Sequence, residues 1–259
     1  MTCKTRIESY EDLAEDIIKW LKDYYYIHAI KAFVVGVSGG IDSAVVSTLC
    51  ARTGLPTYVV CMPLASKFKN TQLSDIHSKQ LEEKYDNVKR IEVELSPVYD
   101  SLMKSVDWWT ERTFEKGEFT NNEHANANTK SRIRMVCLYQ IAGSVGGIVV
   151  GTGNKVEDYG VGFYTKYGDG GVDIAPIADL LKTEVWLLGE YLEVDERICE
   201  APPTDGLWND SRTDESQLGA TYEELEEAME HGTGPAVKIL EQFSTQNKHK
   251  MEPIPTFKL

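Results

Sequence analysis

The sequence predicts an α/β fold, a doubly wound parallel sheet with helices on both faces. Short apolar runs of strand length recur along the chain, segments with helical spacing separate them, and the first and fourth runs end in glycines. Strands buried on both faces are near-continuous apolar runs, and their alternation with helices is typical of βαβ units. Because ligands bind at the carboxyl ends of such strands, we expect the two glycine-marked ends to face one cleft.

Four strands are predicted, at residues 32–37, 57–62, 88–93 and 147–151. Helices are predicted at residues 9–26, 43–52, about 71–84 and about 128–142. The first helix has apolar residues at helical spacing after Ser9, which is a plausible N-cap. The second helix is expected to end before Gly54 and Pro56 because neither residue favours a helix interior.

For the remainder of the chain, secondary structure and domain organisation are predicted from composition and local motifs. The C-terminal third is expected to be helical, and Thr221 stands three residues before Glu224 in the spacing of a capping box. Residues 106–127 are polar with scattered aromatic side chains, so a loop or a mobile segment is expected there. Residues 1–259 are expected to form one domain, with a helical C-terminal portion from about residue 180.

Composition excludes several classes of protein. With 42% apolar residues and 10% aromatic residues, the chain can fill a core and is not expected to be disordered. A net charge of −14 disfavours non-specific binding to nucleic acid or to an anionic membrane. No secretory signal or apolar run of roughly 18 residues is present, and the five cysteines are scattered. We therefore expect a cytoplasmic protein with reduced thiols.

A glycine-rich junction between the first strand and the next helix carries the strongest functional signal. It comprises residues 36–43, which read Gly36-Val37-Ser38-Gly39-Gly40-Ile41-Asp42-Ser43. Glycines permit a tight turn, and the start of the helix offers free amides and a partial positive charge. These features favour a cradle for phosphate over the alternative, a glycine turn that only packs a strand against a helix.

The residue at position 42 indicates which kind of phosphate ligand this loop can bind. A Walker A loop has a lysine before its serine or threonine, whereas this chain has Asp42 before Ser43. An aspartate would repel phosphates unless a cation lay between them, so the loop is predicted to hold a polyphosphate bound to Mg²⁺.

The Ser-Gly-Gly-Ile-Asp-Ser loop resembles that of the ATP pyrophosphatases, a superfamily of the adenine-nucleotide α-hydrolase type with a Rossmann-like fold. Three further segments are similar to those of NAD synthetases. They are the Gly-Thr-Gly-Asn-Lys-Val-Glu-Asp run from Gly151, the Thr-Lys-Tyr-Gly-Asp-Gly-Gly-Val-Asp run from Thr165, and the Asn128 helix with its Arg-Ile-Arg-Met sequence. The resemblance extends from about Asp16 to Lys250, nearly the whole chain.

The resemblance implies roles for individual residues. Asp42 and Glu157 would bind Mg²⁺, and with Asp173 and Lys182 they would form the catalytic group. ATP would contact the loop residues together with Thr152, Lys182 and Thr204. Deamido-NAD would contact Arg132, Lys166, Asp173, His249 and Lys250. A second acid opposite Asp42 suits octahedral Mg²⁺, and a lysine at a helix start is favoured only beside an anion.

The activity that the resemblance implies is ammonia-dependent NAD synthesis. The enzyme would adenylate the nicotinate carboxylate of deamido-NAD with MgATP, release pyrophosphate, and let ammonia displace AMP. It would be a homodimer, and free ammonia is expected because only 35 residues precede Gly36, too few for a glutaminase domain. Two alternatives stay open: another amidotransferase or thiolase of the superfamily, and a non-catalytic nucleotide-binding module.

Overall fold

A computed structural model describes residues 6–64, 68–115, 123–204, 207 and 212–258. Its sheet has four parallel strands in the order β3-β2-β1-β4. They are β1 (Phe33–Gly36), β2 (Thr57–Cys61), β3 (Val88–Glu92) and β4 (Ile148–Val150). Strands β2 and β3 are added in turn on one side of β1, and β4 pairs with the other side of β1. The strand order therefore reverses between β1 and β4, the position at which such sheets bind ligands.

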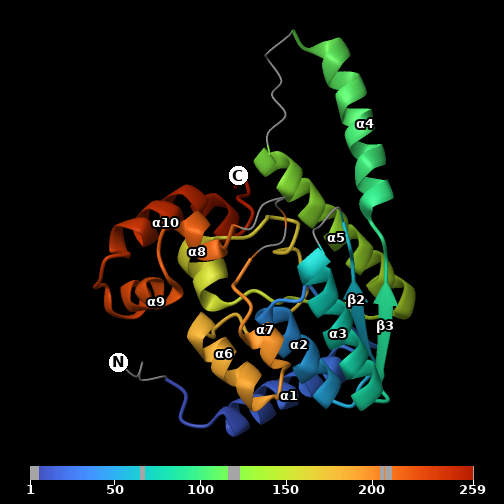
Figure 1. Ribbon diagram of the computed structural model, residues 1–259, viewed down its shortest axis with the longest axis vertical. Coiled ribbons are helices and arrows are strands. Elements are labelled where there is room, and N and C mark those ends of the chain that lie inside the picture. Colours follow the sequence, from blue (N-terminus) through green and yellow to red (C-terminus); the bar gives the residue numbers. More distant parts are fainter. Residues whose placement is uncertain (1–5, 65–67, 116–122, 205–206, 208–211, 259) are drawn as a thin grey trace.

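Helices follow the strands in the order expected for βαβ units (Figure 1). Their bounds are α1 (Tyr10–Ile27), α2 (Ile41–Arg52), α3 (Phe68–Lys84), α4 (Ser96–Thr113), α5 (Glu123–Val145), a π-helical turn η1 (Val156–Val161), α6 (Lys182–Tyr191), α7 (Glu196–Cys199), α8 (Asp214–Leu218), α9 (Tyr222–His231) and α10 (Val237–Met251). Ser9 accepts a hydrogen bond from the amide of Asp12 and so caps α1, as predicted.

Alternate residues of each strand face opposite layers of helices. Val34 of β1 packs with Val60 and Val149 under α5, whereas Phe33 and Val35 face the core shared with α1, α2 and α6. These strand residues are fully buried, so helices cover both faces of the sheet. The predicted fold class, a doubly wound parallel α/β sheet, is confirmed.

A second apolar cluster joins η1 to the helices near the C-terminus. Val156, Val161, Tyr222 and Leu225 are fully buried in it, and α9 and α10 pack against η1. The capping box predicted at the start of α9 is present, since Thr221 accepts a hydrogen bond from the amide of Glu224. This cluster holds η1 beside the carboxyl end of β4.

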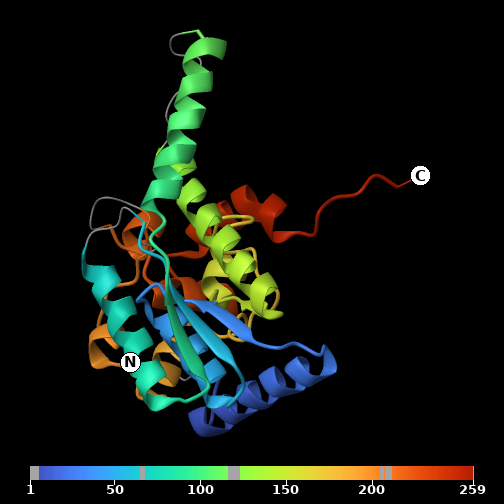
Figure 2. The same cartoon turned by 90° about the vertical axis from the view of Figure 1, so that its right-hand side faces the viewer.

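The prediction of a loop over residues 106–127 is wrong for most of that segment. Helix α4 continues to Thr113 and α5 begins at Glu123, while residues 116–122 lie outside the described part. Pro97 stands in the first turn of α4, and near its end Arg112 lies 3.9 Å over the ring of Trp108. No residue of α4 is buried, and the helix extends away from the sheet (Figure 1, Figure 2). The expectation of a loop rested on the polar composition of residues 106–127, although Val98, Leu102 and Val106 recur at helical spacing.

None of the helices in the described ranges is long and apolar enough to cross a membrane. In the part of the chain that the structure describes, the cysteines are free thiols, namely Cys50, Cys61, Cys137 and Cys199.

Candidate functional site

The glycine-rich loop leaves β1 and turns directly into α2. Gly39 has φ of 90°, a left-handed conformation that residues with a side chain rarely adopt. The Ser43 hydroxyl donates to the Gly40 carbonyl at 2.9 Å and lies 3.1 Å from the Ser38 hydroxyl, so the turn is held by its own side chains. The first backbone bond of α2 runs from Ala44 to Gly40. The three amides ahead of Ala44 have no partner within the helix, as an anion-binding helix start requires.

Asp42 in the first turn of α2 is fixed by a residue from the neighbouring strand end. Asn154 lies in the loop after β4, is fully buried, and donates from Nδ2 to Oδ1 of Asp42 at 3.0 Å. Its Oδ1 accepts a hydrogen bond from the amide of Glu157 at 3.1 Å. The side chain of Asn154 therefore connects the loop after β1 to the loop after β4. The two glycine-marked strand ends lie next to each other, as predicted.

Lys182, the first residue of α6, lies between two carboxylates. Its Nζ is 2.5 Å from Oδ2 of Asp42 and 2.9 Å from Oε1 of Glu157. The lysine side chain is 2% exposed and each carboxylate is 17% exposed. A cation at a helix start is unfavourable unless anions lie near it, and these two acids are those anions.

Burial and ion pairing shift the pKa values of Asp42, Glu157 and Lys182 in opposite directions. Burial lowers the pKa of Lys182, but the charges and hydrogen bonds of the two carboxylates outweigh it and leave that pKa raised. Burial and the charge of Glu157 together outweigh the lowering by Lys182 and Asn154, so the pKa of Asp42 is raised. For Glu157, burial is outweighed by Lys182 and by hydrogen bonds from Tyr222 and Asn154, so its pKa is lowered. Lys182 is therefore a firmly charged ammonium facing Glu157 in its ionised form.

The donor set at this position fits Mg²⁺. Asp42 and Glu157 offer carboxylate oxygens, the hard ligands that Mg²⁺ prefers, and both converge on the one point occupied by Lys182 Nζ. Within the described ranges, no group of three or more His, Cys, Asp or Glu side chains could hold a metal ion. Two carboxylates are the number expected for an ion that shares its remaining positions with phosphates and water.

Four residues predicted to bind the dinucleotide meet at one place, on α5, the loop after η1, and the end of α10. Arg132 donates from Nε to the carbonyl of Lys166 at 3.3 Å, and Lys166 Nζ donates to the carbonyl of His249 at 3.2 Å. Lys250 Nζ donates to the carbonyl of Tyr164 at 2.7 Å. The structure thus gathers cationic side chains that are far apart in the sequence.

The other predicted residues lie around these two groups. Asp173 is exposed, and its two oxygens accept hydrogen bonds from the amide of Val149 and the hydroxyl of Tyr139, at 2.8 and 3.0 Å. It therefore anchors its loop to β4. Thr152 follows β4 directly, and Thr204 is exposed on the segment that leads to α8.

Sequence reasoning missed Asn154 and Tyr222 as members of the site. Asn154 stands inside the Gly-Thr-Gly-Asn-Lys segment, but an amide that bridges two loops is visible only in the fold. Tyr222 donates from its hydroxyl to Oε1 of Glu157 at 2.7 Å. The capping box indicates that Tyr222 begins a helix, yet its partner lies 65 residues away in sequence.

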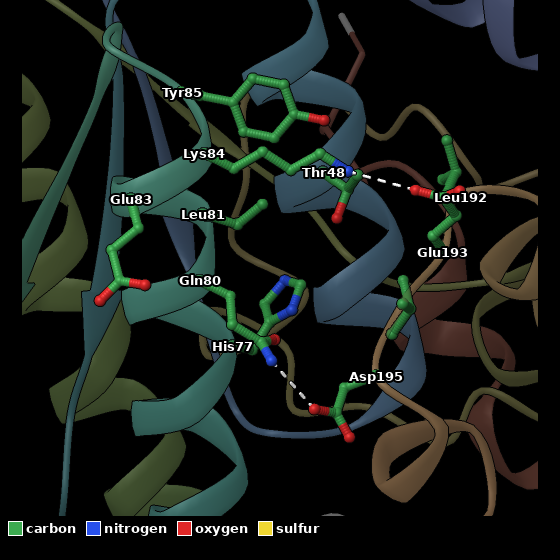
Figure 3. Close-up of a pocket in the computed structure, with 11 residues that line it drawn as sticks. Thr48, His77, Gln80, Leu81, Glu83, Lys84, Tyr85, Leu192, Glu193 and Asp195 are labelled. Carbon is green, nitrogen blue, oxygen red and sulfur yellow. Dashed lines mark hydrogen bonds and ion pairs between the residues drawn. The ribbon is translucent and has the colours of Figure 1, made fainter.

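A separate pocket of about 380 Å³ lies between α2, α3 and the turn after α6 (Figure 3). His77 lines it and is buried, with its Nε2 2.9 Å from the hydroxyl of Ser47. Gln80 donates to Asp195 across the pocket at 3.0 Å. None of the residues predicted to bind substrate or metal lines this pocket.

Comparison with known proteins identifies the family. The family model described as NAD synthase matches residues 13–254. The NH(3)-dependent NAD(+) synthetase of Carboxydothermus hydrogenoformans is 35% identical over 93% of this chain and 95% of its own, and that of Finegoldia magna is 34% identical over 93% and 94%. The solved NMN synthetase of Francisella tularensis superimposes with a TM-score of 0.85 at 31% identity, covering 98% of this chain and 100% of its own. With a glycine-rich loop between β1 and α2, an acid–lysine group beside it and matches along nearly its whole length, the chain belongs to the NAD synthase family.

Proposed function

We propose that this protein is an ammonia-dependent NAD synthetase, a carbon–nitrogen ligase that consumes ATP. The observation that carries the proposal is the meeting of Asp42, Glu157 and Lys182 beside the free amides of the phosphate loop. A module that only binds a nucleotide has no need for two buried acids and a lysine, whereas transfer of AMP requires charge to be stabilised as pyrophosphate leaves.

The first step that we propose is adenylation of the substrate. The nicotinate carboxylate of deamido-NAD attacks the α-phosphorus of ATP, and the bond to pyrophosphate breaks. The amides at the start of α2 would hold the leaving phosphates. Asp42 and Glu157 would hold Mg²⁺, which supplies charge neutralisation on the phosphates when it is bound. Lys182 would donate to the same oxygens.

The second step is attack by ammonia on the acyl-adenylate, with AMP as the leaving group. Positioning and charge stabilisation account for most of this catalysis, and no nucleophilic side chain is required. Asp173 is our proposed acceptor of the proton that ammonia loses. Each oxygen of Asp173 accepts one hydrogen bond and keeps a second lone pair, so the carboxylate can still take up a proton.

Arg132, Lys166, His249 and Lys250 are proposed to bind the anionic nucleotide substrate. Three of these side chains bond only to backbone carbonyls in the contacts described above, and carbonyls are neutral partners that phosphates can replace. The hydrogen bonds that link Arg132 of α5 to Lys166, and Lys166 to His249 of α10, support one continuous binding surface for the phosphates and ribose. Thr152 and Thr204 are proposed to contact ATP from either side of the acid–lysine group.

A second candidate substrate is nicotinic acid mononucleotide. It is favoured by one observation, the TM-score of 0.85 with a protein named NMN synthetase over 98% of this chain. The chemistry is the same, since a nicotinate carboxylate is adenylated and amidated in both cases. The two substrates differ in the adenylate half, so the ratio of their kcat/KM values distinguishes the candidates.

We propose a homodimer in which α4 contributes to the interface. Val98, Leu102, Trp108 and Trp109 of α4 are 53%, 42%, 49% and 64% exposed. Large apolar side chains gathered on one projecting helix are typical of a surface that another chain covers.

The free cysteines support the reducing, cytoplasmic location that we also propose.

The direct test supplies the purified chain with MgATP and ammonium, and with either deamido-NAD or nicotinic acid mononucleotide. Equimolar AMP, pyrophosphate and an amidated product are expected with at least one substrate. ATP binding without pyrophosphate release under all conditions would make the protein a nucleotide-binding module.

A further inference from the structure

Glu157 has two donors on a single oxygen. Its Oε1 accepts from Lys182 Nζ at 2.9 Å and from the Tyr222 hydroxyl at 2.7 Å. These donors come from the first residues of α6 and α9.

Tyr222 is held rigidly where it makes this bond. It is fully buried, and its amide donates to Oε1 of Glu215 in α8 at 3.1 Å. The ring of Trp186 meets its ring edge-on, with centroids 5.9 Å apart, and Lys182 Nζ lies 5.0 Å from the ring centroid. The hydroxyl therefore points toward Glu157, with Asp214 at 3.5 Å as a longer and weaker second acceptor.

Lys182 cannot by itself keep Glu157 in place during the reaction. It also bonds to Asp42, and an incoming phosphate competes for the same ammonium. When Lys182 turns toward the phosphate, the Tyr222 hydroxyl is the donor that stays on Oε1. Fixed hydrogen bonds of this kind orient carboxylates that bind metals.

We propose that Tyr222 is a positioning residue that orients Glu157 for binding the Mg²⁺ of MgATP. The inference rests on the proposed function, because it takes Glu157 to be a metal ligand. It adds a residue from the C-terminal helices whose hydroxyl acts on the reaction through Glu157.

The test compares Tyr222→Phe with wild type in the full-length chain. The ring is retained, so the packing against Trp186 and Lys182 is preserved. Binding of Mn²⁺ in the presence of α,β-methylene ATP is measured by electron paramagnetic resonance, and Tyr222→Phe is expected to weaken it roughly 10–100-fold. The KM for the nicotinate nucleotide should stay unchanged. Tyr25→Phe is the matched control, because that hydroxyl bonds to the carbonyl of Lys31, away from the site.

A double-mutant cycle with Glu157→Gln separates positioning from a merely structural role. If Tyr222 acts through Glu157, its loss should change Mn²⁺ binding little once Glu157 is gone. An equal loss in both backgrounds, or wild-type Mn²⁺ binding by Tyr222→Phe, would overturn the proposal. Wild-type binding by Glu157→Gln would instead remove the metal assignment itself.

A second measurement covers the case in which Tyr222→Phe does not fold. With 3-fluorotyrosine at position 222, the hydroxyl is retained and the fluorine resonance reports its surroundings. Addition of Mg²⁺ and the ATP analogue should shift that resonance in the wild-type background and not in Glu157→Gln. A shift of equal size in both backgrounds counts against the proposal.

Discussion

Lys182 donates a hydrogen bond of 2.5 Å to Asp42, although the two residues are 140 positions apart in sequence. The same ammonium binds Glu157, so a single buried cation balances two acids. Removing one member of such a group leaves buried charge without compensation. The first two predictions follow from this relationship.

Replacing Lys182 with alanine should affect stability as well as ATP use. The free energy of unfolding should fall by about 3–5 kcal/mol in the absence of divalent cations, since two like charges are left together. Mg²⁺ should restore part of that loss because a divalent ion can replace the ammonium. Denaturant unfolding with EDTA and with Mg²⁺ measures both effects, and the KM for ATP should rise. Lys79→Ala, which removes an exposed ion pair to Asp75, is the control and should cost less than about 1 kcal/mol. If Mg²⁺ does not change the free energy of unfolding of Lys182→Ala, the proposed metal site is contradicted.

Replacing Asp42 with asparagine should abolish pyrophosphate release while leaving the fold intact. The amide retains the shape of the side chain but removes a charge that the metal requires, so the loss should be at least about 100-fold. Release of pyrophosphate from ATP is measured alongside thermal unfolding. Asp179→Asn serves as the control, because that carboxylate is 90% exposed. Near-normal turnover by Asp42→Asn would show that Asp42 is not required as a metal ligand.

Stability should decrease at mildly acidic pH because of His77. Burial lowers the pKa of His77 to about 4, from an ordinary value of 6.5 in the unfolded chain. The unfolded state therefore binds a proton that the folded state excludes. The contribution of His77 to stability is full above about pH 6.5, declines as the pH falls, and is lost by about pH 4.

This decline should amount to roughly 2–4 kcal/mol over that interval. Urea unfolding at several pH values should show a flatter profile for His77→Gln than for wild type. His28→Gln, an exposed histidine, should keep the wild-type profile. Parallel pH profiles for wild type and His77→Gln would show that His77 does not titrate in this way.

Free ammonia should be the nitrogen donor of the isolated protein. The relatives named NH(3)-dependent synthetases match this chain over more than nine-tenths of both lengths. The rate should increase with total ammonium and with pH, because only NH₃ carries the lone pair that attacks the acyl-adenylate. NAD formation is followed with ammonium and with ammonia-free glutamine. Robust product from glutamine alone would reveal a glutaminase site that the described residues do not explain.

Charge placed on α4 should dissociate the proposed dimer. Val98 and Leu102 are large apolar side chains one turn apart and exposed, and glutamate at both positions would bury charge in an interface. The mass measured by light scattering at micromolar concentration should fall from two chains to one. Lys104→Gln on the same helix is the control. If wild type is a monomer, or the double variant remains a dimer, α4 is not the interface.

The sequence by itself determined the fold class and the centre of the site. Short apolar runs such as 32–37 favour buried strands, and the glycines around Ser38 and Asp42 predict a phosphate loop, because both signals are local. The helix after Ser96 was not predicted, because the polar composition of residues 106–127 favoured a loop over the helical spacing of Val98, Leu102 and Val106.

Only the tertiary structure decided which side chains meet. Asn154 reaches Asp42 because β1 and β4 are neighbours, and Tyr222 reaches Glu157 because α9 packs on η1. Lys182 likewise binds two carboxylates instead of solvent because the start of α6 is buried against both loops. Each of these bonds joins residues more than 20 positions apart, and only the packing of the helices on the sheet brings their side chains within reach of one another.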